Sequence, residues 1–250
     1  MLILNEITNM IDPLDPFDFR AIYEQYDRLA PRYNESIIML GLDPKKIKND
    51  RALYYHLRNK FSVKQNISMD DYIHLLFWKL NTSGNSTWRK LLTEEDRKKR
   101  EATSLNAVIR SLPDSLNKNV KEINNFLKRI YFCLYGMRYE TKDRAKAAWP
   151  TRSTFLHFIY PDIIPIFDKM VLKAVDPDYE DGDNKKLDKF LQYIPHVWKL
   201  AQKYKDKIKN IPNLRDTDVR IIEMALWITR DGQNKLKNEC RHVGYKQDEH

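Results

Sequence analysis

The stretch Trp149–Val175 reads WPTRSTFLHFIYPDIIPIFDKMVLKAV and divides into three parts. Short polar residues follow Pro150 and then give way to apolar ones, which predicts a helix over 151–159. The run Tyr160–Phe167 is apolar but contains two prolines, so we expect an extended, buried connector here and not a central strand. Asp168 then begins a second helix, whose apolar residues recur at steps that place them on one face. The stretch therefore predicts that Asp168 lies at the start of a helix, directly after an apolar connector.

Asp168 has a structural and a chemical interpretation. Asp is a favoured N-cap residue because its carboxylate accepts hydrogen bonds from the free N–H groups of the first turn, and capping is the commoner reason for Asp at such a position. The positive end of the helix dipole also favours the ionised carboxylate. A fixed negative charge at neutral pH can serve in chemistry, so the two interpretations are compatible.

The segment resembles the core of the helix-hairpin-helix DNA glycosylase superfamily, including its 8-oxoguanine-glycosylase-like branch. Members carry a Val/Ile-Pro-x-x-Asp element after a polar helix start and an apolar connector, and Ile164-Pro165-Ile166-Phe167-Asp168 stands in its place. The resemblance implies that Asp168 is the catalytic aspartate. It places Arg152 where bifunctional members carry a Schiff-base lysine, so it implies a glycosylase without lyase activity. The family's glycine-rich hairpin is degenerate here, because residues 149–153 contain no Gly.

Composition predicts an all-α fold. The chain has 250 residues, of which 42% are hydrophobic and only six are Gly, and few segments alternate as strands do. We expect a single domain over 1–250, with a basic C-terminal tail from about residue 231 that is loosely held. The resemblance to the glycosylases further implies that the fold has two packed helical halves with a cleft between them.

The charge balance favours an anionic partner. The net charge is +9 and the sequence pI is about 9.3, and nucleic acid is the commonest partner of such a chain, although a merely basic surface is the alternative. Basic residues accumulate directly before Trp149, as a rim that follows DNA phosphates requires, and polar residues at the next helix start can hold a phosphate. The predicted DNA-binding residues are Lys142, Arg144, Lys146, Arg152, Ser153 and Thr154.

A polar loop in the first half of the chain is the predicted base pocket. The segment Asn81–Trp88 is rich in amides and hydroxyls and ends in an aromatic residue. Its simplest interpretation is a surface connector beside a core tryptophan. The functional interpretation is a pocket wall, in which Trp88 stacks on a base while Asn81 and Asn85 bind its edge.

No metal and no cofactor are expected from the sequence. Cys133 and Cys240 lie far apart without the spacing of metal ligands, and His56, His74 and His157 show none either. His157 lies on an apolar face, where a hydrogen-bonded core residue is the common case. Nucleotide-binding and nucleophile motifs are also absent. No apolar run is long enough to cross a bilayer and the N-terminus lacks the pattern of a signal peptide, so we predict a cytoplasmic protein without membrane association.

These features lead to a functional hypothesis that needs no cofactor. When an N-glycosidic bond breaks, the sugar becomes an oxocarbenium-like cation that a fixed carboxylate can stabilise, once the nucleotide has been flipped out of the base stack. We therefore expect a monofunctional DNA glycosylase, a hydrolase that excises a damaged or modified base. The resemblance also covers bacterial proteins that excise modified bases from phage DNA, which implies antiviral defence as one role. The alternatives are a non-catalytic helical DNA-binding protein on the same scaffold and a protein-interaction module.

Overall fold

The computed structural model describes residues 9–15, 18–29, 35–81, 87–130, 134–140 and 145–229, and within them the regular secondary structure is almost entirely helical. The predicted all-α fold is confirmed, with one short antiparallel ribbon that the sequence did not predict. The predicted loose tail from residue 231 lies outside the described residues. The elements are α1 (Phe19–Leu29), α2 (Glu35–Met39), α3 (Asp50–Phe61), η1 (Lys64–Asn66), α4 (Met69–Leu80), α5 (Thr87–Thr93), α6 (Glu95–Ser111), α7 (Val120–Arg129), β1 (Arg138–Glu140), β2 (Ala145–Ala147), α8 (Trp149–Ile159), α9 (Lys169–Val175), η3 (Asp183–Lys185), α10 (Leu187–Lys203), α11 (Lys205–Lys209) and α12 (Asp218–Thr229).

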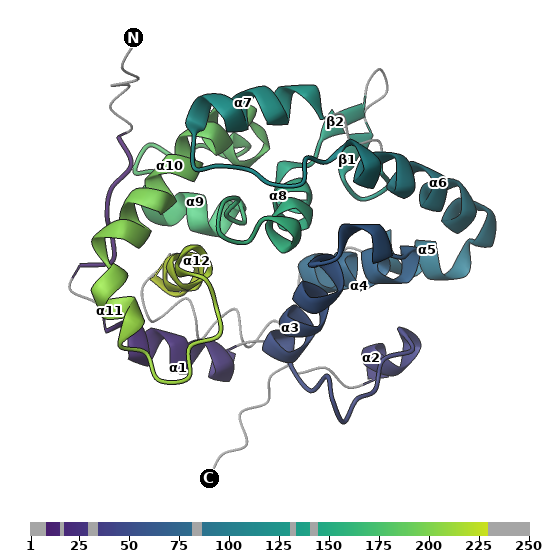
Figure 1. Cartoon of the computed structure of the whole chain (residues 1–250), viewed down its shortest axis with the longest axis horizontal. Helices are drawn as coiled ribbons and strands as arrows, with labels where there is room; N and C mark the ends of the chain where they lie inside the picture. The colour runs from purple at the N-terminus through teal and green to yellow at the C-terminus, as the bar shows by residue number, and fades with distance from the viewer. Residues whose placement is uncertain are drawn as a thin grey trace.

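The helices form two groups that meet at α8. In one group α12 packs against α1, α9 and α10, and in the other α4 packs against α3, α5 and α6. Helix α8 contacts both α3 and α4 and leads through the connector into α9, so it lies between the groups (Figure 1). One cluster of buried apolar side chains extends from Leu14 to Ile228 and includes residues of both groups. The stretch 149–175 therefore lies at the centre of the fold.

Local capping explains where several helices begin. Helix α4 starts with a capping box, in which the Ser68 hydroxyl accepts from Asp71 N–H while the Asp71 carboxylate accepts from Ser68 N–H. Helix α3 begins at Asp50, because the Asn49 side chain accepts from Ala52 N–H and caps the helix there. Asn119 does the same for α7, since its side chain accepts from Glu122 N–H.

Pro195 does not interrupt its helix. It lies inside α10, which continues from Leu187 to Lys203, and α11 follows after Tyr204. In the part of the chain that the structure describes, none of these helices has both the length and the apolar character that crossing a bilayer demands.

Candidate functional site around Asp168

The connector 160–167 has the buried, irregular form that its sequence predicts. Ile164, Ile166 and Phe167 are at most 4% exposed, yet the segment belongs to no helix or strand of the structure. Its backbone N–H and C=O groups therefore lack the partners that regular structure supplies, and unpaired buried groups are costly.

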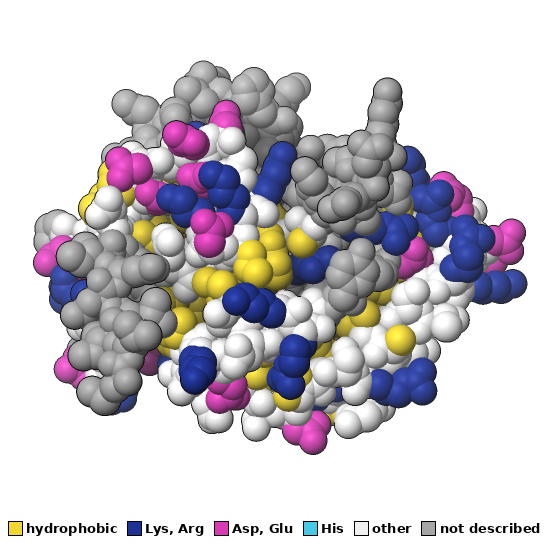
Figure 2. All heavy atoms as spheres, turned by 90° about the horizontal axis from the view of Figure 1, so that it is seen from above, with side chains coloured by type: hydrophobic (Ala, Val, Ile, Leu, Met, Phe, Trp, Pro, Cys, Tyr) yellow, Lys and Arg dark blue, Asp and Glu magenta, His cyan; other side chains and the backbone are white. Residues whose placement is uncertain are grey.

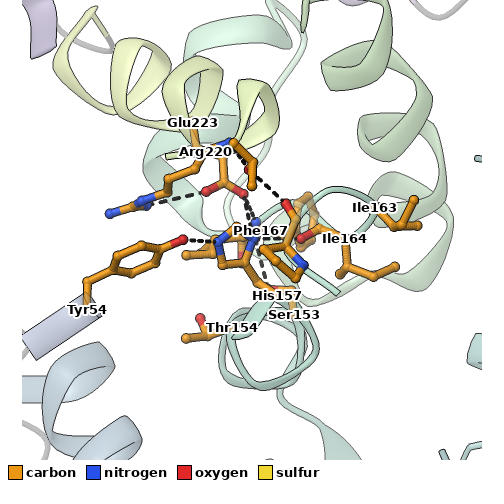
Figure 3. A network of polar contacts seen from close by, with 12 residues as sticks. Tyr54, Ser153, Thr154, His157, Ile163, Ile164, Phe167, Arg220 and Glu223 are labelled. Carbon is orange, nitrogen blue, oxygen red and sulfur yellow. Dashed lines mark hydrogen bonds and ion pairs between the residues drawn. The ribbon is translucent and has the colours of Figure 1, made fainter. Parts of the chain in front are cut away.

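Side chains from α8, α10 and α12, together with Thr217 directly before α12, provide those partners. The Ser153 hydroxyl accepts from Phe167 N–H at 2.8 Å, and the Glu223 carboxylate accepts from Ile166 N–H (Figure 3). The remaining bonds are His157 Nδ1 to Ile164 O at 2.8 Å, Trp198 Nε1 to Ile163 O at 2.8 Å, and Thr217 Oγ1 to Pro161 O at 3.1 Å. The residues directly before Asp168 are thus held on a fixed path.

Asp168 caps α9 and also forms an ion pair. Its Oδ1 accepts from Met170 N–H at 2.8 Å and from Val171 N–H at 3.1 Å, as the capping interpretation predicts. Its Oδ2 lies 3.0 Å from Lys79 Nζ at the end of α4. The Asp168 side chain is 23% exposed and the Lys79 side chain 12%. This pair joins the two helix groups, and the Asp168 side chain remains partly exposed.

The Asp168 carboxylate is held in its ionised form. Burial by itself would raise the pKa of this group, but the Lys79 ammonium and the N–H groups of Val171 and Met170 outweigh it and lower the pKa below its ordinary value. The predicted negative charge at a helix start is therefore present at neutral pH. Lys79, which no sequence motif singles out, contributes a large part of the lowering of the Asp168 pKa.

A polar network lies directly behind the pair, within the core. His157 donates from Nδ1 to a carbonyl, which can only accept, so its Nε2 accepts from the Tyr54 hydroxyl at 2.9 Å. Burial and then the nearby Arg220 lower the pKa of His157 to about 3, so its ring is neutral. The prediction that His157 is a hydrogen-bonded core residue is confirmed.

Two ionisable residues of α12, Arg220 and Glu223, complete this network. Arg220 Nη1 lies 3.3 Å from Glu223 Oε2, and both side chains are almost fully buried (Figure 3). Burial raises the pKa of Glu223 to about 8, although Arg220 and the Ile166 N–H oppose the shift. Arg220 also donates from Nη2 to the Tyr26 hydroxyl at 2.8 Å, which in turn donates to Asp50 at 2.7 Å. The network links α12 to α1 and α3.

Three predicted phosphate contacts are buried in α8. Arg152 is 4% exposed, and Ser153 and Thr154 are not exposed at all. Arg152 Nε donates to Met137 O at 3.1 Å, and Thr154 Oγ1 donates to Pro150 O at 2.8 Å. The reason is that α8 is enclosed on all sides, so its polar residues serve the fold. These three side chains therefore do not lie at the surface of the protein, where the sequence had predicted contacts with DNA.

The other predicted DNA contacts are placed only in part. Lys146 belongs to strand β2, where it pairs with Tyr139 of β1. Lys142 and Arg144 lie outside the described residues. Lys146 thus lies in a short ribbon directly before α8, and the contact of Lys142, Arg144 and Lys146 with phosphate stays a prediction.

The structure describes two of the three residues of the predicted base pocket. Trp88 is 2% exposed and packs edge-on against Phe77, with ring centroids 5.1 Å apart, which is the core tryptophan of the simpler interpretation. Asn81 follows α4 as its C-cap and is half-buried, two residues beyond Lys79. Asn85 lies outside the described residues. Trp88 therefore has no face open to stack on a base.

The surface carries basic side chains in several places. Figure 2 shows Lys and Arg spread over one face, with Asp and Glu among them and apolar side chains at its centre. A cleft with a volume of about 740 Å³ lies between α6 and α7, where Val108, Phe126 and Arg129 contribute to its lining. Its lining includes neither Asp168 nor another predicted site residue.

Comparisons with known proteins do not assign the chain to a family. No protein-family model, no curated protein and no solved structure matches it. The resemblance of 149–175 to the glycosylases therefore rests on the sequence of that segment.

Proposed function

We propose that this protein is a monofunctional DNA glycosylase, which hydrolyses the N-glycosidic bond of a damaged or modified base. The observation that carries the proposal is the Asp168 carboxylate, which is ionised, rigidly held and partly open to solvent at the meeting point of the two helix groups. A preorganised negative charge stabilises the cationic sugar that forms as the base leaves. The net charge of +9 supports DNA as the substrate.

Asp168 and Lys79 have separate roles in this proposal. The carboxylate stabilises the developing positive charge on the sugar and orients the attacking water. Lys79 positions the carboxylate through its 3.0 Å contact with Oδ2, and keeps it deprotonated. Lys142, Arg144 and Lys146 are the proposed contacts to the DNA backbone. Action on modified phage DNA, and hence antiviral defence, is part of the proposal through the resemblance.

The test measures base release from defined DNA. The full chain is incubated with duplexes that contain 8-oxoguanine, uracil, alkylated bases or modified cytosines, and with genomic DNAs that differ in modification. Released base is identified by mass spectrometry and abasic sites by alkaline strand cleavage. We expect release from at least one substrate, without strand cleavage before alkali. We expect Asp168→Asn to lose roughly 100- to 1000-fold in rate, because it removes the charge of the carboxylate.

Asp12→Asn is the matched control. Asp12 is also paired with a lysine, Lys203 at 2.6 Å, and its side chain is 22% exposed, close to the 23% of Asp168. This control variant should release base at the wild-type rate. Equal activity of the wild type and Asp168→Asn would remove the catalytic assignment, and intact substrates throughout would remove the glycosylase proposal.

A non-catalytic DNA-binding protein is the second candidate. It is favoured by the engagement of both Asp168 oxygens, Oδ1 by the cap and Oδ2 by Lys79, which a purely structural acid would also show. This candidate predicts DNA binding that weakens steeply with salt, persists in Asp168→Asn and yields no abasic product.

A further inference from the structure

Two histidines and an aspartate come together between α3 and α4, away from the network behind Asp168. His56 lies on α3, and Asp71 and His74 lie on successive turns of α4. One possible ligand atom from each of the three residues lies within 4.8 Å of the other two. In the sequence these residues showed no metal-ligand spacing, because one ligand comes from a different helix.

His74 is oriented as a metal ligand requires. Its Nε2 lies 2.9 Å from Leu40 O, and because a carbonyl only accepts, this nitrogen carries the proton. Its Nδ1 therefore has a free lone pair, and it is buried without a hydrogen-bond partner among the described residues. The residue is only 8% exposed. A histidine whose second nitrogen donates to a backbone carbonyl is the usual arrangement around bound metals.

Asp71 and His56 are also free to coordinate. Both hydrogen bonds from Ser68 to Asp71 use Oδ2, which leaves Oδ1 for a ligand. His56 is half-buried and stands beside His74, with ring centroids 6.2 Å apart.

We propose that His56, Asp71 and His74 bind a divalent transition metal of the zinc type. Two imidazoles and one carboxylate are a known three-ligand set for zinc, with water in the fourth position, and imidazole disfavours Mg²⁺ and Ca²⁺. Tetrahedral zinc holds its ligand atoms roughly 3.4 Å apart, so the atoms approach by about 1.5 Å at most when the ion binds. The bound ion joins α3, α4 and the Leu40 backbone segment.

The experiment measures metal binding by the full chain after treatment with chelator. Zn²⁺ at about a hundredfold excess over its Kd should raise the Tm by roughly 5 to 10 °C. Co²⁺ should produce a saturable visible absorption with one equivalent bound, and Mg²⁺ should produce no shift in Tm. These readouts do not depend on any enzymatic activity.

His56→Gln and His74→Gln test the ligands, and His196→Gln is their control. His196 is a comparably buried histidine, 9% exposed, whose Nε2 likewise lies 3.0 Å from a backbone carbonyl, that of Ile11. Each ligand variant should weaken Co²⁺ and Zn²⁺ binding at least tenfold, and the control should bind as the wild type does. His56→Gln decides the test should His74→Gln fail to fold, because His56 forms no hydrogen bond with a described residue. The proposal is overturned when the wild type shows neither the Tm shift nor the absorption, or when His56→Gln binds as tightly as the wild type.

Discussion

At the scale of single residues, Asp168 shows how one side chain serves two neighbours. Its Oδ1 caps α9 and its Oδ2 pairs with Lys79, a residue 89 positions earlier in the chain. The cap depends only on adjacent residues, whereas the ion pair depends on the approach of α4. Both interactions favour the charged carboxylate, and they outweigh the burial that opposes it.

Replacement of Asp168 should separate the cap from the charge. Asp168→Ala removes both and should lower the free energy of unfolding by about 1–2 kcal/mol, whereas Asp168→Asn keeps a capping side chain and should cost less. Because the pKa of Asp168 is lowered by folding, its charge contributes stability above the unfolded pKa of about 3.9. This contribution is lost as the pH falls through the lower folded pKa.

Urea unfolding from neutral to acid pH measures this contribution. The stability difference between the wild type and Asp168→Asn should be largest near neutral pH and disappear under strong acid. A difference that stays constant across this range would show that the carboxylate gains nothing from its ionised form.

At the scale of elements, the connector 160–167 is held by side chains in place of a sheet or helix. Ser153 both accepts from Phe167 N–H and lies within hydrogen-bonding distance of Phe167 O, at 3.3 Å. His157 and Glu223 bind the connector at Ile164 and Ile166. This explains why polar residues are buried in a helix as enclosed as α8. Their role is to satisfy the backbone that leads to Asp168.

Ser153→Ala should therefore destabilise the connector. The substitution leaves the buried Phe167 N–H without a partner, which costs about 1–3 kcal/mol. Amide hydrogen exchange at Phe167 should become faster, which separates a local effect from a general loss of stability. Ser104→Ala is the control, since the Ser104 hydroxyl contacts only the carbonyl of Arg100 in its own helix. Unchanged exchange at Phe167 would argue against the role of Ser153.

At the scale of the whole molecule, α12 ties distant parts of the chain together. Arg220 bonds to Tyr26 of α1, which bonds to Asp50 of α3, while Glu223 binds the connector. These contacts join residues from both helix groups in one network. A buried network of this kind favours one arrangement of the groups, because a partner removed from it leaves another group unpaired.

Glu223 should make the stability of the protein fall as the pH rises from about 4.5 to 8. Its pKa is raised by burial to about 8 in the folded state, so the folded protein retains a proton that the unfolded chain releases. Stability then declines with a slope of at most about 1.4 kcal/mol per pH unit for this single proton. Glu223→Gln removes this part of the pH dependence. Urea unfolding across this range compares the two proteins, and identical slopes would mean that Glu223 is ionised in the fold.

The sequence by itself determined the local features of this protein. Pro165 and the apolar run before Asp168 predicted the connector, and Asp168 predicted a helix start that the structure contains. These features depend on residues only a few positions apart, whose backbone geometry and capping bonds follow from residue type. The helical character of the whole chain follows from the same local periodicity.

The tertiary structure alone decided which distant side chains meet. The pairing of Lys79 with Asp168, and the approach of His56 to Asp71 and His74, require two helix faces to pack, and no local pattern specifies that. The burial of Arg152 was likewise hidden, because a polar residue in a helix is expected at the surface unless neighbouring elements enclose it. The physical reason is range: helix capping acts within one turn, whereas ion pairs, buried networks and metal sites depend on how complete helices pack.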